Sequence, residues 1–135
     1  MEKHFRPMDE ELFAIAFVHP LKRQRVRGLL QSEKGRAKFL SQLPHFSDLN
    51  PRFSRKIVPS QQRVELILSL LLGRGAGVTC YVISTSAEID QMNGPLTSVL
   101  REVIGYYPGT IVSCVPGRLA YFEGEARNER YILER

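Results

Sequence analysis

The segment from Ser84 to Pro95 has the residue types and the position in the chain that suit a ligand site. It leaves an expected strand and enters an expected helix, an order that places polar side chains and free backbone N–H groups around a ligand. Its carboxylates would repel an anion and favour a cation or a polar neutral group. The alternative is a solvated loop whose side chains bind their own backbone. The candidate ligand-binding residues, including one carboxylate from a later strand, are Ser84, Ser86, Asp90, Asn93 and Glu123.

The last turns of the chain carry carboxylates that can do acid–base chemistry. Paired carboxylates act as general acid and base when their environments separate their pKa values. Exposed ion pairs at strand ends are the alternative, and they are more common. A metal-dependent nuclease would also need a lysine nearby, and no lysine follows Lys56. The charged residues concerned are Glu123, Glu125, Glu129, Arg118, Arg127 and Arg130.

Other sequence features argue against a cofactor or a metal. The glycines from Gly73 to Gly77 follow an expected helix and precede an expected strand, which is the reverse of a phosphate-binding loop. The three histidines are isolated from one another, and Cys80 and Cys114 are 34 positions apart, so no metal-ligand spacing exists. Both cysteines fall in strand-like runs, which predicts buried, reduced thiols. We therefore expect no cofactor and no metal.

Charge is distributed unevenly along the 135 residues. Up to Gly77 there are 14 Lys/Arg against 7 Asp/Glu, whereas from Val78 onward there are 5 against 7. Between Pro20 and Lys56 the excess is largest, with 10 basic residues against two acidic ones. This asymmetry indicates a surface that faces something acidic.

The basic stretch is therefore the second candidate site. Aromatic residues and a histidine lie among its cations, a combination that suits RNA or single-stranded nucleic acid. An acidic protein partner fits the charge equally well, and a merely solvated helix face is the alternative to both. The interleaved rings are Phe39, His45, Phe46 and Phe53. The candidate partner-binding residues are Lys22, Arg23, Arg25, Arg27, Lys34, Arg36 and Lys38.

Hydrophobic periodicity predicts helices in the first half of the chain. Ser32 is an expected helix N-cap, and the apolar stripe of the last helix indicates that it is the most buried one. The expected helices run from about residue 7 to Val18, from Leu21 to Leu30, from Ser32 to Leu43 and from Ser60 to Gly73, with an ordered loop over 44–59.

The second half predicts strands. The expected elements are a strand over 78–83, a helix from Pro95 to Ile104, strands over 110–115 and 118–123, and a possible fourth strand over 130–133. Strand, helix, strand implies a parallel pair with a crossover, and Pro116-Gly117 implies a wide turn or a bulge. The prediction is a single α+β domain. Its helical part, about 1–73, packs on a small mixed sheet of three or four strands, about 78–135, with one crossover helix.

The longest early apolar run, Leu12 to Val18, is too short for a membrane span or a signal peptide, and acidic residues precede it. We expect a cytoplasmic protein without a membrane partner. The resulting hypothesis is a non-enzymatic binding module that contacts an acidic protein or nucleic acid through its basic helical face. The alternative is a small ligand-binding protein or enzyme that uses the loop over 84–95.

Overall fold

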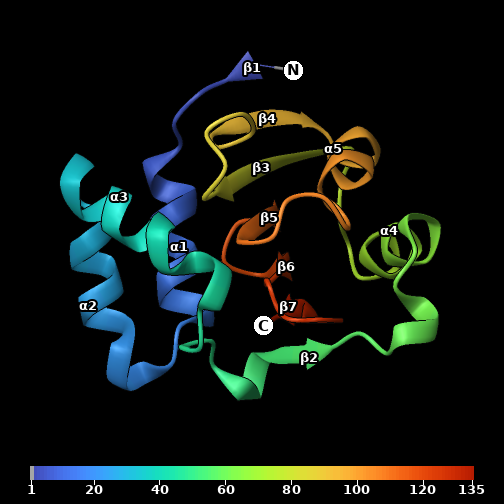
Figure 1. The fold of residues 1–135 in the computed structure, drawn as a ribbon, viewed down its shortest axis with the longest axis horizontal. Helices are drawn as coiled ribbons and strands as arrows, with labels where there is room; N and C mark the ends of the chain where they lie inside the picture. Colours follow the sequence, from blue (N-terminus) through green and yellow to red (C-terminus); the bar gives the residue numbers. More distant parts are fainter. Residues whose placement is uncertain (1) are drawn as a thin grey trace.

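The computed structural model describes residues 2–135, in which five α-helices and a seven-stranded sheet are found (Figure 1). No helix in this range is long and apolar enough to cross a membrane. The helices are α1 (Pro7–Phe17), α2 (Pro20–Leu30), α3 (Glu33–Gln42), α4 (Val64–Gly73) and α5 (Leu96–Val103). The strands are β1 (Glu2–Lys3), β2 (Ser54–Lys56), β3 (Thr79–Ser84), β4 (Met92–Pro95), β5 (Thr110–Val115), β6 (Leu119–Glu123) and β7 (Arg130–Glu134).

The sheet is larger than the sequence predicts. Its strand order is β1-β4-β3-β5-β6-β7-β2, and every neighbouring pair is antiparallel. The expected mixed sheet of three or four strands is therefore wrong, although the α+β class holds. The edge strands β1 and β2 are short and polar, as edges often are. Both lie outside the expected helices: β1 precedes the first of them, and β2 falls in the segment 44–59 that was expected to be an ordered loop.

The predicted parallel pairing of β3 with β5 is also wrong. The segment over 92–95, expected to be loop, forms β4 and turns the chain back beside β3. Helix α5 then leads from β4 into β5, which pairs with β3 antiparallel. The crossover helix therefore joins two strands that flank β3 and run in the same direction.

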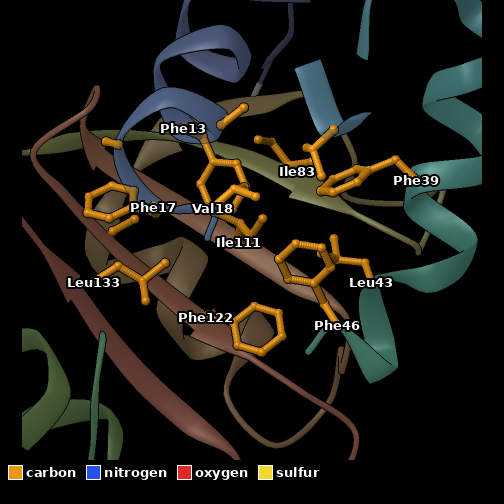
Figure 2. Packing of buried hydrophobic residues seen from close by; sticks show 14 of the residues in the cluster. Phe13, Phe17, Val18, Phe39, Leu43, Phe46, Ile83, Ile111, Phe122 and Leu133 are labelled. Carbon is orange, nitrogen blue, oxygen red and sulfur yellow. The ribbon is translucent and has the colours of Figure 1, made fainter. Parts of the chain in front are cut away.

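Helices cover both faces of the sheet, and each face has its own core (Figure 1). Helices α1, α2 and α3 pack on one face, where Phe13, Phe39 and Phe122 are buried with Ile83 and Ile111 (Figure 2). Helices α4 and α5 pack on the other. Because successive side chains of a strand point to opposite faces, a sheet covered on both sides has almost continuously apolar strands. This accounts for the strong strand signal of β3, β5 and β6.

Several local predictions can be compared with the structure. Ser32 caps α3, since its Oγ accepts the N–H of Gly35 at 3.0 Å, which confirms that prediction. A shift in register between Ser113 and Val115 confirms the bulge next to the Pro-Gly turn. Helix α4 begins at Val64 rather than Ser60 and is not the most buried helix. It buries only Ile67 and Leu71 fully, whereas α1 buries five residues.

Candidate functional site

The outer surface of α2 and α3 carries the exposed cations of the predicted partner site. The two helices pack together, with α1 beside them against the sheet (Figure 1). Val26 and Leu30 of α2 and Phe39 of α3 are buried, which holds both helices on the core. Four of the seven predicted basic residues are exposed, and none of them forms an ion pair within residues 2–135. These four are Lys22, Arg25, Lys34 and Lys38.

The other three predicted cations are engaged or partly buried. Arg27 donates from Nε to Glu11 Oε1 at 2.7 Å. Arg23 is half-buried, and its Nε lies buried without a hydrogen-bond partner among the described residues. Arg36 is buried and bonded to two carboxylates. The exposed basic surface is therefore smaller than the predicted one.

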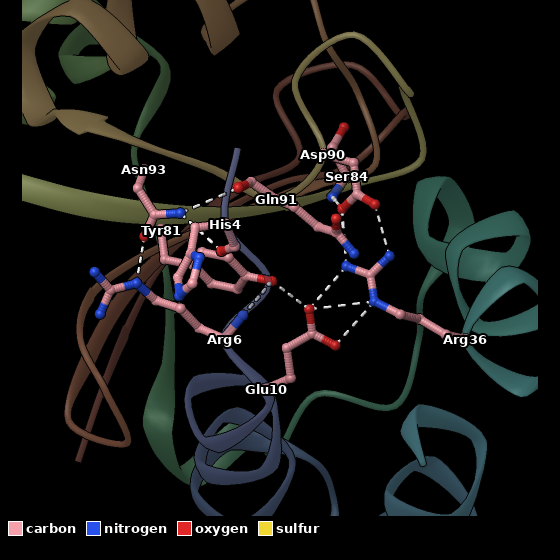
Figure 3. Close-up of polar contacts among 9 residues, drawn as sticks. All are labelled: His4, Arg6, Glu10, Arg36, Tyr81, Ser84, Asp90, Gln91 and Asn93. Atoms are coloured by element: carbon pink, nitrogen blue, oxygen red, sulfur yellow. Dashed lines mark hydrogen bonds and ion pairs between the residues drawn. The ribbon is translucent and has the colours of Figure 1, made fainter. Parts of the chain in front are cut away.

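Arg36 holds together three separate parts of the chain (Figure 3). Its Nε and Nη2 donate to the carboxylate of Glu10 on α1 at 2.9 and 2.8 Å. Its Nη1 and Nη2 donate to Asp90, before β4, at 2.6 and 2.9 Å. Tyr81 of β3 donates to Glu10 at 2.6 Å. The arrangement is a planar guanidinium between two carboxylates, bidentate to each.

This network perturbs the ionisation of its members. Burial alone would lower the pKa of Arg36, but its hydrogen bonds to Asp90 and Glu10 raise that pKa above its usual value. Burial and the hydrogen bond to Glu10 also raise the pKa of Tyr81. Both groups therefore stay in one protonation state at neutral pH. The network stabilises the position of α3, which presents half of the basic surface.

The polar side chains of the segment over 84–95 mainly bind their own surroundings. Ser84 is fully buried, and its Oγ lies 2.7 Å from Thr110 Oγ1. The N–H of Ser86 donates to Ser84 Oγ at 3.0 Å. Asp90 accepts the N–H of Ser84 at 2.9 Å, besides its bonds to Arg36. The amide of Asn93 donates to the carbonyl oxygens of His4 and Gln91, and its oxygen accepts from Arg6 (Figure 3).

The predicted cluster of these residues with Glu123 does not assemble. Ser84 and Asp90 meet, but Glu123 has a separate set of partners two strands away. Its carboxylate accepts the N–H of Gly105 and the hydroxyl of Tyr121, both at 2.8 Å, and pairs with Arg130 at 3.3 Å. Burial and the nearby Glu123 raise the pKa of Tyr121. Because the polar atoms already have partners, this region has the features of structural support.

Sequence reasoning missed Glu10 on α1, which accepts hydrogen bonds from Arg36, and Tyr81 on β3, which donates to Glu10. Glu10 lies three, four and seven positions before Phe13, Ala14 and Phe17, on the buried side of its helix. An acidic residue in an apolar stripe is costly to bury without a cation. That position was the available signal that Glu10 needed a basic partner from elsewhere.

A hollow of about 670 Å³ lies between the start of α2 and the β2 edge, and sequence reasoning did not predict it. His19, His45, Lys56 and Tyr131 line it. His19 Nδ1 accepts the N–H of Leu21 at 3.2 Å, so it caps α2. His45 is largely exposed, and its Nε2 lies 2.7 Å from Glu125. Within residues 2–135, no three histidine, cysteine or acidic side chains gather where they would hold a metal ion.

The aromatic residues that alternate with the cations are mostly not available to stack on bases. Phe39 and Phe46 are buried and pack edge to face, with ring centroids 5.6 Å apart. Phe53 is half-buried, and the guanidiniums of Arg52 and Arg135 lie 5.4 and 4.7 Å from its ring centroid. The cations and the rings thus do not form one stacking surface.

Comparison with known proteins finds no family model, no curated protein and no solved structure that matches the chain.

Proposed function

We propose that this protein is a non-enzymatic binding module that contacts an acidic segment of another protein through the outer face of α2 and α3. The observation that carries the proposal is the set of four exposed cations without an ion-pair partner among residues 2–135. We call them the basic face: Lys22, Arg25, Lys34 and Lys38.

The support of these helices favours a preorganised surface. The side chains of Val26, Leu30 and Phe39 pack into the core beneath them. Arg36 adds a buried connection from α3 to α1 and to the segment before β4. A partner would therefore need little reordering of the backbone, which lowers the entropic cost of binding. Like charges held near one another also attract an acidic chain at long range and speed its encounter.

An acidic protein segment fits these observations better than single-stranded nucleic acid does. Nonspecific binding of single strands combines cations with aromatic rings on which bases stack. Here Phe39 and Phe46 are buried, and Phe53 is covered by guanidinium groups. Contacts to carboxylates need only the exposed cations. The alternative function, a ligand site over 84–95, is less well supported because the polar groups there already bind one another.

The test is the binding of a fluorescently labelled oligoglutamate of about 20 residues, followed by anisotropy at low salt. The test variant combines Lys22→Glu with Arg25→Glu, two exposed changes on α2. The matched control combines Arg63→Glu, at the N-cap of α4, with Arg101→Glu on α5. It changes the net charge by the same amount, but at the helices that cover the opposite face of the sheet. We expect at least a tenfold loss of affinity for the test variant, less than threefold for the control, and melting temperatures near that of the wild type.

Salt and competition complete the experiment. The affinity of the wild type for oligoglutamate should fall as salt rises, because salt screens the attraction between the cations and the peptide. The affinity of the test variant should depend less on salt, because two of these cations are missing. Equal weakening by both variants would contradict the basic face. Absence of binding to oligoglutamate at low salt would overturn the proposed function. Displacement of the labelled peptide by single-stranded RNA, at concentrations far below those needed of unlabelled oligoglutamate, would show that the preferred partner is a nucleic acid and not an acidic protein.

A further inference from the structure

The two cysteines, far apart in the sequence, lie on neighbouring central strands. In the ladder between β3 and β5, Tyr81 is opposite Ser113 and Ser84 is opposite Thr110. Continuing this register by one residue places Cys80 opposite Cys114. Both cysteines belong to the core on the side of α4 and α5, where Val82 and Val112 are also buried. The two thiol side chains therefore extend from adjacent strands on the same face of the sheet.

The hydrogen-bond pattern of the ladder indicates how closely such side chains approach. The N–H of Thr85 donates to the carbonyl of Gly109 at 3.0 Å, so these two residues form a hydrogen-bonded pair. Pair types alternate along an antiparallel ladder, and side chains are closer in the non-hydrogen-bonded pairs. Ser84 with Thr110 is the next pair, and its side-chain oxygens are 2.7 Å apart. Cys80 with Cys114 lies four residues further along each strand and is a pair of the same type.

The surroundings of the thiols leave them free to react with each other. Cys80 and Cys114 both line a hollow of about 250 Å³, together with Thr79 and Ser113. Within residues 2–135, the hydrogen-bond contact of each thiol is a long one to a backbone oxygen, from Cys80 to Gly94 at 3.6 Å and from Cys114 to Val112 at 3.8 Å. Both are free thiols in the structure. A small oxidant can therefore approach through the hollow without disrupting a strong interaction.

We propose that Cys80 and Cys114 are an oxidation site, at which a peroxide converts the two thiols to a disulfide between β3 and β5. The thiolate of one cysteine attacks an oxygen of hydrogen peroxide, the O–O bond breaks, and a sulfenic acid and water form after proton transfer. The second thiol then attacks the sulfenic sulfur, the S–S bond forms, and a second water leaves. Two thiols are oxidised and one peroxide is reduced. This inference does not depend on the proposed function.

The disulfide would connect the sheet where its pairing becomes irregular. Ser113 and Val115 mark the register shift between β5 and β6, so Cys114 lies at the bulge. The covalent loop from Cys80 to Cys114 encloses β4 and α5. Because a crosslink restricts the unfolded chain, the oxidised protein should unfold at a higher temperature than the reduced one, provided the bond forms without strain.

The test treats the folded protein with hydrogen peroxide and follows its intact mass. We expect the loss of two hydrogen atoms in the monomer, recovery after reduction, and a crosslinked peptide pair containing Cys80 and Cys114. Cys80→Ser and Cys114→Ser should each abolish that mass change. Burial raises the pKa of both thiols to about 12, so the rate should rise about tenfold per pH unit between pH 7 and 10.

Three results would overturn the proposal. They are disulfides between separate molecules only, sulfinic or sulfonic acids without a disulfide, and an internal disulfide that forms only in urea. The last result would show that the thiols meet in the unfolded chain and not in the fold. A series at urea concentrations below the unfolding transition separates these cases, because native oxidation should proceed at the same rate throughout it.

Discussion

Replacing Arg36 by alanine should destabilise the protein strongly, although the sequence places this residue among surface cations. The substitution removes the guanidinium between Glu10, which is 1% exposed, and Asp90. The two carboxylates would then face each other without a cation in a largely dry environment. Removing one member of a buried ion pair costs about 3–5 kcal/mol. The unfolding entropy is about 2.1 cal/mol/K per residue, so for a chain of 135 residues this loss of free energy lowers the melting temperature by about 10–18 °C.

The assay is urea unfolding at pH 7, with Arg25→Ala as the matched control. Arg25 is an exposed arginine on the adjacent helix, and its removal should change the free energy of unfolding by less than about 0.5 kcal/mol. Arg36→Lys keeps the charge but loses the bidentate geometry, so its loss of stability should be intermediate. Equal, small effects of Arg36→Ala and Arg25→Ala would refute the buried network.

Three further predictions concern the core, the helix cap and the buried phenols. Leu71→Ala should cost about 2–5 kcal/mol because Leu71 is fully buried, and Leu68→Ala should cost less because Leu68 is half-buried; urea unfolding measures both. Ser32→Ala should cost about 1 kcal/mol in the same assay, and Ser32→Gly only a few tenths. The fold raises the pKa of Tyr81 and Tyr121 above the ordinary value of 10.0, so above that pH the unfolded chain releases protons that the fold retains. The free energy of unfolding should therefore fall as pH rises from 10 to 11, and a double Tyr→Phe variant should flatten the fall.

Local patterns predicted much of the fold because they depend on nearby residues. The helices α1, α2, α3 and α5 and the strands β3, β5 and β6 follow the apolar periodicity of their own segments. The prediction failed for the short strands. Met92–Pro95 has no alternation of apolar residues, and it pairs because β3 lies beside it. Overlooking that one strand reversed the inferred direction of β5 relative to β3.

The candidate site shows a similar division. Charge counting located the basic helices, but it treated all of their cations alike. The burial of Arg36 depends on Glu10 and Asp90, which are 26 positions before it and 54 after it, and no local pattern connects them. The strong apolar stripe of α4 likewise overstated its burial, since Leu72 remains 49% exposed. Partners that are distant in sequence determine which members of a charged or apolar group are buried.

The most direct test of the account is to locate the acidic partner on the folded protein. Amide chemical shifts of the isotope-labelled protein can be followed while unlabelled oligoglutamate is added at low salt. The account predicts shifts concentrated in residues 20–42, around Lys22, Arg25, Lys34 and Lys38, which disappear when salt is raised. Shifts concentrated in α4 and α5, or no shifts at saturating peptide, would contradict it.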